Sequence, residues 1–92
     1  MRVSLKVKDR LREEIPASRL DQYLTRQLHR VPGFDAVDVS AGYRLSVPDA
    51  GGCNWSGNVV LLYDRCAPRP ELTAAALRPI VRAARARFNM SE

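Results

Sequence analysis

The chain has 92 residues, of which 46% are hydrophobic, and its 15 basic residues against 10 acidic ones leave a net charge of +5. This length and balance predict one domain, residues 1–92, which is large enough to bury a core without a metal or a disulfide. No apolar run approaches the roughly 18 to 20 residues that span a bilayer, and residues 1–8 alternate in polarity instead of forming a signal-peptide core. We therefore expect a cytoplasmic protein with no membrane partner.

The first third of the chain predicts a strand, a helical turn and a helix. Residues 2–8 alternate between apolar and polar side chains, which predicts a half-buried strand with a basic outer face. Asp9 then caps a short helical turn that extends to Ile15. From residue 18 to residue 31 apolar residues recur at helical spacing, and Pro32 and Gly33 end that helix. These apolar residues are Leu20, Tyr23, Leu24, Leu28 and Val31.

Two strands follow, separated by a long loop. Residues 37–47 alternate strictly, which predicts one buried and one solvated face. Residues 59–63 form a continuous apolar run typical of a central strand. The simplest arrangement is an antiparallel hairpin whose loop begins at Pro48.

Residues 71–89 predict one final helix, with Pro79 inside it as a site of kinking. At about 100° per residue, one face is apolar and its opposite side is basic. The apolar face consists of Leu77, Ile80, Val81, Ala84 and Phe88. The basic row consists of Arg78, Arg82 and Arg85. A strip of small residues permits close approach to the first helix or to a second protomer; it comprises Ala75, Ala76, Pro79, Ala83 and Ala86.

The order strand-helix-strand-strand-helix predicts an α+β fold. We expect a two-layer sandwich in which two helices cover one face of a three-stranded, mainly antiparallel sheet. The other face of that sheet is then open or covered by a partner. The same order occurs in the RNA-recognition fold, but the outward positions Ser4 and Lys6 lack the aromatic rings that stack bases there.

The candidate binding loop lies between the two strands of the hairpin and consists of Cys53, Asn54, Trp55 and Ser56. It contains the chain's only tryptophan and is flanked by Gly51, Gly52 and Gly57. In one interpretation Trp55 and Asn54 form a recognition surface, since glycines permit positive φ and close backbone approach. In the other, Trp55 folds back as a lid over the core, Asn54 satisfies turn amides and Cys53 is a small buried filler.

The cysteines and the histidine predict neither a bridge nor a metal site. If the apolar run between Cys53 and Cys66 is extended, the two lie roughly 20 Å apart, too far for a disulfide. Together with His29, the only histidine, they fall short of the four ligands of structural zinc. A thiol nucleophile at Cys53 needs a base, and nothing in the spacing brings His29 to it. We expect His29 to be exposed in the last turn of its helix.

The basic side chains predict contacts with a nucleic acid or with an acidic protein. Three or four phosphate contacts alone give weak, salt-sensitive binding to nucleic acid. The candidate contact residues are Lys6, Lys8, Arg44, Arg78, Arg82 and Arg85.

Residues 49–56, read as Asp, Ala, Gly, Gly, Cys, Asn, Trp and Ser, precede a hydrophobic strand and a helix that ends at residues 84–89. This second half of the chain resembles small uncharacterised bacterial proteins, some of them carried by phage or other mobile elements. The resemblance implies no known activity. It suggests, by analogy, a small protein that binds and modulates a host protein complex.

Three functional hypotheses follow, none requiring a cofactor. The first is a non-enzymatic binding module whose partner is another protein or, as a homodimer, a second copy of the chain. The alternative is a nucleic-acid-binding protein that uses the arginine row. The third is a thiol enzyme that acts through Cys53.

Overall fold

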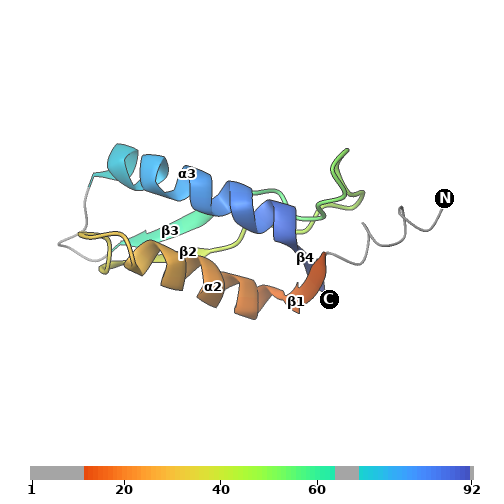
Figure 1. Cartoon of the computed structure of the whole chain (residues 1–92), viewed down its shortest axis with the longest axis horizontal. Coiled ribbons are helices and arrows are strands. Elements are labelled where there is room, and N and C mark those ends of the chain that lie inside the picture. The colour runs from red at the N-terminus through yellow and green to blue at the C-terminus, as the bar shows by residue number, and fades with distance from the viewer. Residues whose placement is uncertain (1–11, 64–68, 92) are drawn as a thin grey trace.

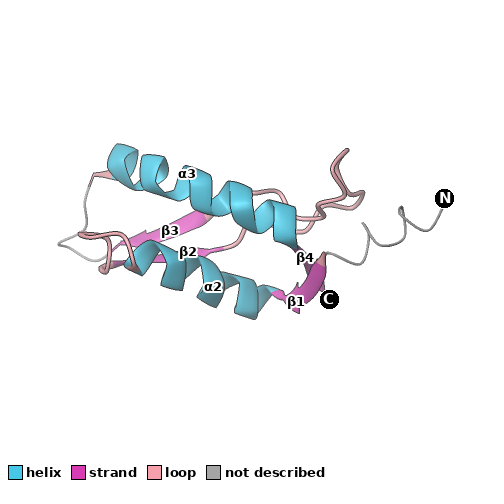
Figure 2. Ribbon diagram, in the orientation of Figure 1, coloured by secondary structure: helices cyan, strands magenta, loops and turns pink. Residues whose placement is uncertain are grey.

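The computed structural model describes residues 12–63 and 69–91, which form two helices and four short strands. In chain order these are β1 (Glu13–Pro16), α2 (Ala17–His29), β2 (Val37–Ser40), β3 (Val60–Tyr63), α3 (Pro70–Arg87) and β4 (Phe88–Ser91). The helices lie side by side against the hairpin of β2 and β3, and β1 and β4 meet at one end (Figure 1, Figure 2). The α+β class predicted from the sequence is confirmed.

The strands pair as two separate ladders of two strands. β2 and β3 are antiparallel, with Val37 opposite Tyr63 and Ser40 opposite Val60, so the predicted hairpin is confirmed. β1 and β4 are parallel. A three-stranded antiparallel sheet is not confirmed, and the strand expected over residues 2–8 lies outside the described residues.

Helix α2 follows the predicted apolar spacing. Leu20, Leu24 and Leu28 recur every four residues and are fully buried against the hairpin and α3. The chain then turns through Gly33, whose φ of 93° suits glycine. Within the described residues, neither helix combines the length and the apolar character needed to cross a bilayer.

The segment before α2 differs from the prediction. Ile15 was expected at the end of a helical turn, but it lies in β1 and is paired with Met90 of β4. The local pattern of apolar residues was compatible with a helix, whereas a ladder to the opposite end of the chain holds this segment extended. The proposed capping residue Asp9 lies outside the described residues.

Helix α3 confirms the predicted core face, because Leu77 and Ala84 are buried and Pro79 remains within the helix. Its predicted end was wrong. Phe88 and Asn89 are not helical; they begin β4, where Phe88 has φ −117° and ψ 145°. Pairing with β1 and hydrogen bonds from the hairpin loop stabilise this extended backbone.

The hairpin is shorter than its alternating pattern predicted. β2 ends at Ser40, and beyond it one bridge links Arg44 to Trp55. Tyr43 and Val47 are 65% and 72% exposed, so the predicted apolar face stops contributing to the core here. A buried face requires an opposing layer, and none of the described elements covers these two side chains.

β3 is not buried on both faces as its apolar run suggested. Val60 and Leu62 point away from the helices and are 54% and 57% exposed. Leu61 points to the helix side, where it packs against the core. Among the described residues, the hairpin therefore has one covered and one open face.

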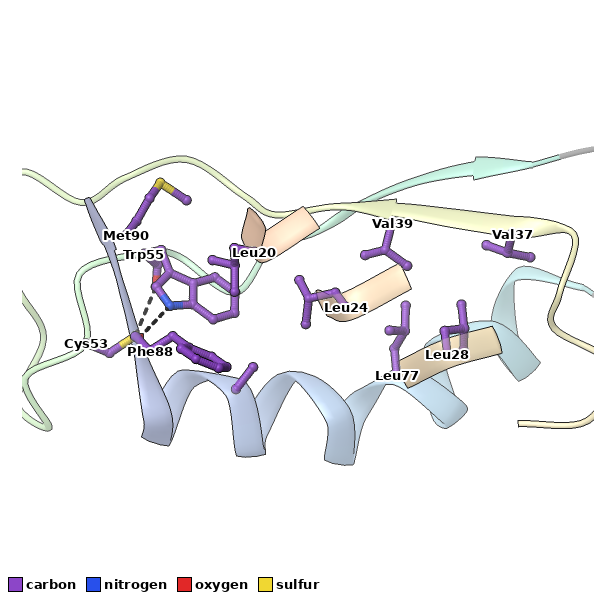
Figure 3. Close-up of a cluster of buried hydrophobic side chains, with 11 residues drawn as sticks. Leu20, Leu24, Leu28, Val37, Val39, Cys53, Trp55, Leu77, Phe88 and Met90 are labelled. Carbon is purple, nitrogen blue, oxygen red and sulfur yellow. Dashed lines mark hydrogen bonds between the residues drawn. The ribbon is translucent and has the colours of Figure 1, made fainter. Parts of the chain in front are cut away.

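The core runs between the helices and the hairpin (Figure 3). At one end it contains Trp55, Phe88 and Met90, and at the other end it contains Leu28 and Val37. The tryptophan of the hairpin loop is thus part of the core.

Candidate functional site

The loop predicted as a binding site is anchored to β4. Trp55 is fully buried, and its indole Nε1 donates a hydrogen bond of 3.0 Å to the carbonyl oxygen of Phe88. Tyr23 meets the Phe88 ring edge to face, with the ring centroids 4.9 Å apart. Of the two interpretations of Trp55, the core side chain is the one observed.

Asn54 makes the second anchor. Its side chain donates to the carbonyl oxygen of Met90 (2.9 Å) and accepts from the Met90 amide (2.7 Å). The backbone amide of Asn54 donates a third hydrogen bond, to the side-chain oxygen of Asn89. The carboxamide thus pairs with Met90 as a strand residue would, which is why a residue with both a donor and an acceptor is needed here.

Two arginines fasten the same loop to the end of α3. The Arg85 guanidinium donates to the carbonyl oxygen of Trp55 and, at 2.6 Å, to a carboxylate oxygen of Asp49. Arg12 donates to the carbonyl oxygens of Arg85 and Gly51. The guanidinium group carries several donors in a fixed plane, so each arginine joins two segments at once.

Asp49 also organises the turn that precedes Cys53. Its Oδ1 accepts from the amides of Cys53 (3.0 Å) and Gly51 (2.9 Å). The hydrogen bond from the Cys53 amide is the largest cause of a lowered pKa at Asp49. Together with the contact with Arg85 and the bond from Gly51, it favours the ionised carboxylate and lowers that pKa below its ordinary value of 3.8. The loop's polar groups therefore serve its own conformation.

Cys53 and His29 do not meet. Cys53 is buried, and its Sγ lies 3.6 Å from the carbonyl oxygen of Trp55. His29 lies within 2.8 Å of the carbonyl oxygen of Val37, and Figure 3 places Val37 at the end of the core opposite to Cys53. The structure thus offers Cys53 no imidazole base. Within residues 12–63 and 69–91, no three metal-ligating side chains of His, Cys, Asp or Glu cluster together.

The predicted basic contact residues separate into four groups. Arg78 and Arg82 are exposed on α3, whereas Arg85 is turned toward the hairpin loop. Arg44 is exposed on the loop after β2. Lys6 and Lys8 lie outside the described residues.

The arginine row borders a groove of about 530 Å³ between α3 and β3. Its floor consists of aliphatic side chains from both elements, and three arginines stand along the helix side. The lining residues are Ser56, Gly57, Val59, Leu61, Ala74, Leu77, Arg78, Val81, Arg82 and Arg85. The groove therefore combines an apolar surface with positive charge.

Gly57 is one of the residues that line this groove. It has φ 79°, and a Cβ added to it would lie 2.8 Å from the Cδ of Arg85. Only glycine allows the backbone to pass so close to that arginine. Sequence reasoning found the arginine row but missed Val59 and Leu61, because no signal in the sequence indicates that α3 lies beside β3 and the residue that precedes it.

A second hollow, of about 440 Å³, lies between α2 and β2 and is lined by polar and charged residues. Two of its side chains already form hydrogen bonds within the chain. Asp21 accepts one from the backbone amide of Ala41, and Thr25 bonds to the backbone of Val39. It is therefore the weaker candidate for a ligand.

Comparison of the chain with protein-family models, with curated proteins and with solved structures finds no match. The groove between α3 and β3 is therefore interpreted from its own geometry.

Proposed function

We propose that this protein is a non-enzymatic binding module whose groove between α3 and β3 holds an acidic, partly apolar segment of another protein. The observation that carries the proposal is the composition of the groove. Leu61, Leu77 and Val81 offer an aliphatic floor, and the exposed Arg78 and Arg82 stand at its rim. Such a surface gains free energy from apolar contact and selects its ligand by charge.

The lining favours binding over catalysis. It contains arginine guanidinium groups and the Ser56 hydroxyl, but no carboxylate, imidazole or thiol that could act as a general base. The Ser56 hydroxyl already accepts a hydrogen bond from the backbone amide of Asn58. The groove therefore has the means to hold a ligand rather than to transform it.

The lining also favours a peptide over a nucleic acid. Proteins that hold single strands combine basic grooves with aromatic rings on which bases stack. The groove's lining has no aromatic ring, whereas its aliphatic side chains match those of a protein segment. The net charge of +5 attracts acidic protein segments as well as nucleic acids, so it does not decide between them.

A fluorescence-anisotropy titration with a defined peptide tests this proposal. The probe is a labelled, end-capped peptide, Val-Thr-Glu-Thr-Glu-Thr-Val, compared with the same peptide in which lysine replaces both glutamates. We expect the acidic peptide to bind the full chain with a Kd below about 1 mM, and the lysine peptide to bind at least about tenfold more weakly. Because the arginines are exposed, binding should weaken as salt is raised.

Charge reversal locates the site. The double variant Arg78→Glu and Arg82→Glu should lose at least about tenfold in affinity, while Arg19→Glu, at an exposed position of α2, should bind as wild type. Equal affinity of the double variant and wild type would overturn the proposal. So would tighter binding of a labelled single-stranded DNA that is lost in the same double variant, because the groove would then be a nucleic-acid site.

A further inference from the structure

The two edges of the hairpin differ in how their backbone groups are satisfied. On the outer edge of β2, the Thr25 hydroxyl accepts a hydrogen bond from the amide of Val39 (2.9 Å) and donates one to the carbonyl oxygen of Val39 (3.0 Å). Nε2 of His29 lies 2.8 Å from the carbonyl oxygen of Val37. Side chains of α2 thus close this edge.

These bonds fix the direction of every backbone group in the hairpin. The carbonyl of Val37 and both backbone groups of Val39 face α2, and the amide of Val37 donates to the carbonyl oxygen of Phe34 in the preceding loop. Val37 and Val39 therefore belong to non-hydrogen-bonded pairs of the antiparallel ladder. The bonded pairs must then be Asp38 with Leu62 and Ser40 with Val60.

It follows that Leu61, opposite Val39, turns its amide and carbonyl away from β2 and toward the free edge of β3. Among the described residues, none donates to that carbonyl or accepts from that amide. The side chain of Leu61 lines the groove. The open edge and the arginine-rimmed groove are therefore one continuous surface.

We propose that the partner segment binds as an additional β-strand, pairing with the backbone of Leu61 along the free edge of β3. This inference rests on the proposed function and adds the conformation and pattern of the ligand. An exposed edge is a template for another strand, and peptide-binding proteins use it so that backbone bonds supply affinity and side-chain pockets supply specificity.

The spacing of the arginines defines that pattern. Arg78 and Arg82 are four residues apart on α3, which is about 6 Å along the helix axis. Side chains two residues apart on one face of a strand are separated by about 6.6 Å. Two acidic residues at positions i and i+2 of the added strand match the two arginines, and apolar residues beyond them meet the aliphatic floor.

Charge argues for a partner over the chain's own N-terminal segment. Residues 2–8 have a strand-like pattern but contain Arg2, Lys6 and Lys8. A basic strand beside Arg78 and Arg82 would add like charges, whereas an acidic strand neutralises them.

N-methylated peptides test strand addition without altering the protein. One version of the Val-Thr-Glu-Thr-Glu-Thr-Val peptide carries N-methyl groups on both glutamates, and another carries them on the first two threonines. Alternate amides of an added strand face the edge, so one version should lose at least about tenfold in affinity while the other binds as the parent.

Amide hydrogen exchange of the full chain, followed by NMR, supplies the second readout. Saturating peptide should slow exchange at Leu61 by at least about tenfold, with little change at Leu62, whose amide already bonds to β2.

If the parent peptide binds but both methylated versions bind equally and Leu61 exchange is unchanged, strand addition is wrong and the proposed function stands. If the parent does not bind, both fail. Protection of Leu61 in the free protein equal to that of Leu62 would mean that the chain itself occupies the edge, which also overturns the inference.

Discussion

Asn54 and Met90 exchange two hydrogen bonds, one from the side-chain amide to the Met90 carbonyl and one from the Met90 amide back to the side-chain oxygen. Both residues are buried. One side chain therefore takes the place of a strand at the edge of β4 and joins the hairpin loop to the end of the chain.

Replacing Asn54 by alanine should destabilise the fold strongly. The Asn54→Ala variant leaves the buried amide and carbonyl of Met90 without partners, and each unsatisfied group costs about 1–3 kcal/mol. We expect the free energy of unfolding to fall by about 2–6 kcal/mol, measured by urea denaturation followed by circular dichroism. Asn58→Ala, at an exposed position of the same loop, is the control and should stay within about 0.5 kcal/mol of wild type. A loss below about 1 kcal/mol for Asn54→Ala would contradict the role given to this pair.

Trp55 should report its burial directly, because it is the only tryptophan. In the native protein we expect blue-shifted emission and little quenching by acrylamide, and both should change to solvent-exposed values in urea. The indole is enclosed by the core, so the quencher cannot reach it without local unfolding. Native quenching as efficient as in the unfolded chain would instead favour the exposed recognition surface.

The part of the fold that sequence predicts well depends on local repetition. The four-residue spacing of Leu20, Leu24 and Leu28 indicates a helix regardless of what lies around it. The same holds for Leu77 and Ala84 of α3. The arginines of α3 do share one side of the helix, but they flank its apolar face instead of opposing it, since they line the groove together with Leu77 and Val81. In each case one element's periodicity is sufficient.

Where the prediction failed, a distant partner decides the local structure. Phe88 continues the helical spacing of α3, yet it begins β4 because β1 pairs with it from the other end of the chain. Strand β4 in turn supplies the carbonyl oxygen of Phe88, to which the Trp55 indole donates a hydrogen bond. The residues around Trp55 therefore could not predict that it is buried. The groove depends in the same way on Leu61 lying near Leu77.

Cys53 should behave as a buried thiol and not as a nucleophile. With Cys66→Ser in the background to leave a single thiol, we expect slow reaction with a disulfide reagent in native buffer and fast reaction in urea. The reason is steric, since Cys53 is enclosed by the core and has no imidazole beside it. Rapid native labelling near neutral pH would revive the thiol-enzyme hypothesis.

Asp49 should make the fold sensitive to acid. Hydrogen bonds from the amides of Cys53 and Gly51, together with Arg85, lower the pKa of Asp49 in the folded chain, whereas the unfolded chain retains the ordinary value of 3.8. A group with a lower pKa when folded stabilises the protein fully above the unfolded pKa and loses that contribution as pH falls through the folded pKa. The loss should therefore begin at about pH 4 and continue below it.

The variant Asp49→Asn tests this dependence. Its side-chain oxygen still accepts hydrogen bonds from the turn amides, so urea midpoints should be lower at neutral pH but decline less steeply with acid. Asp35→Asn, which removes an exposed carboxylate in the loop after α2, is the matched control and should keep the wild-type slope. Identical acid dependence of Asp49→Asn and wild type would show that ionisation of Asp49 does not contribute to the stability of the fold.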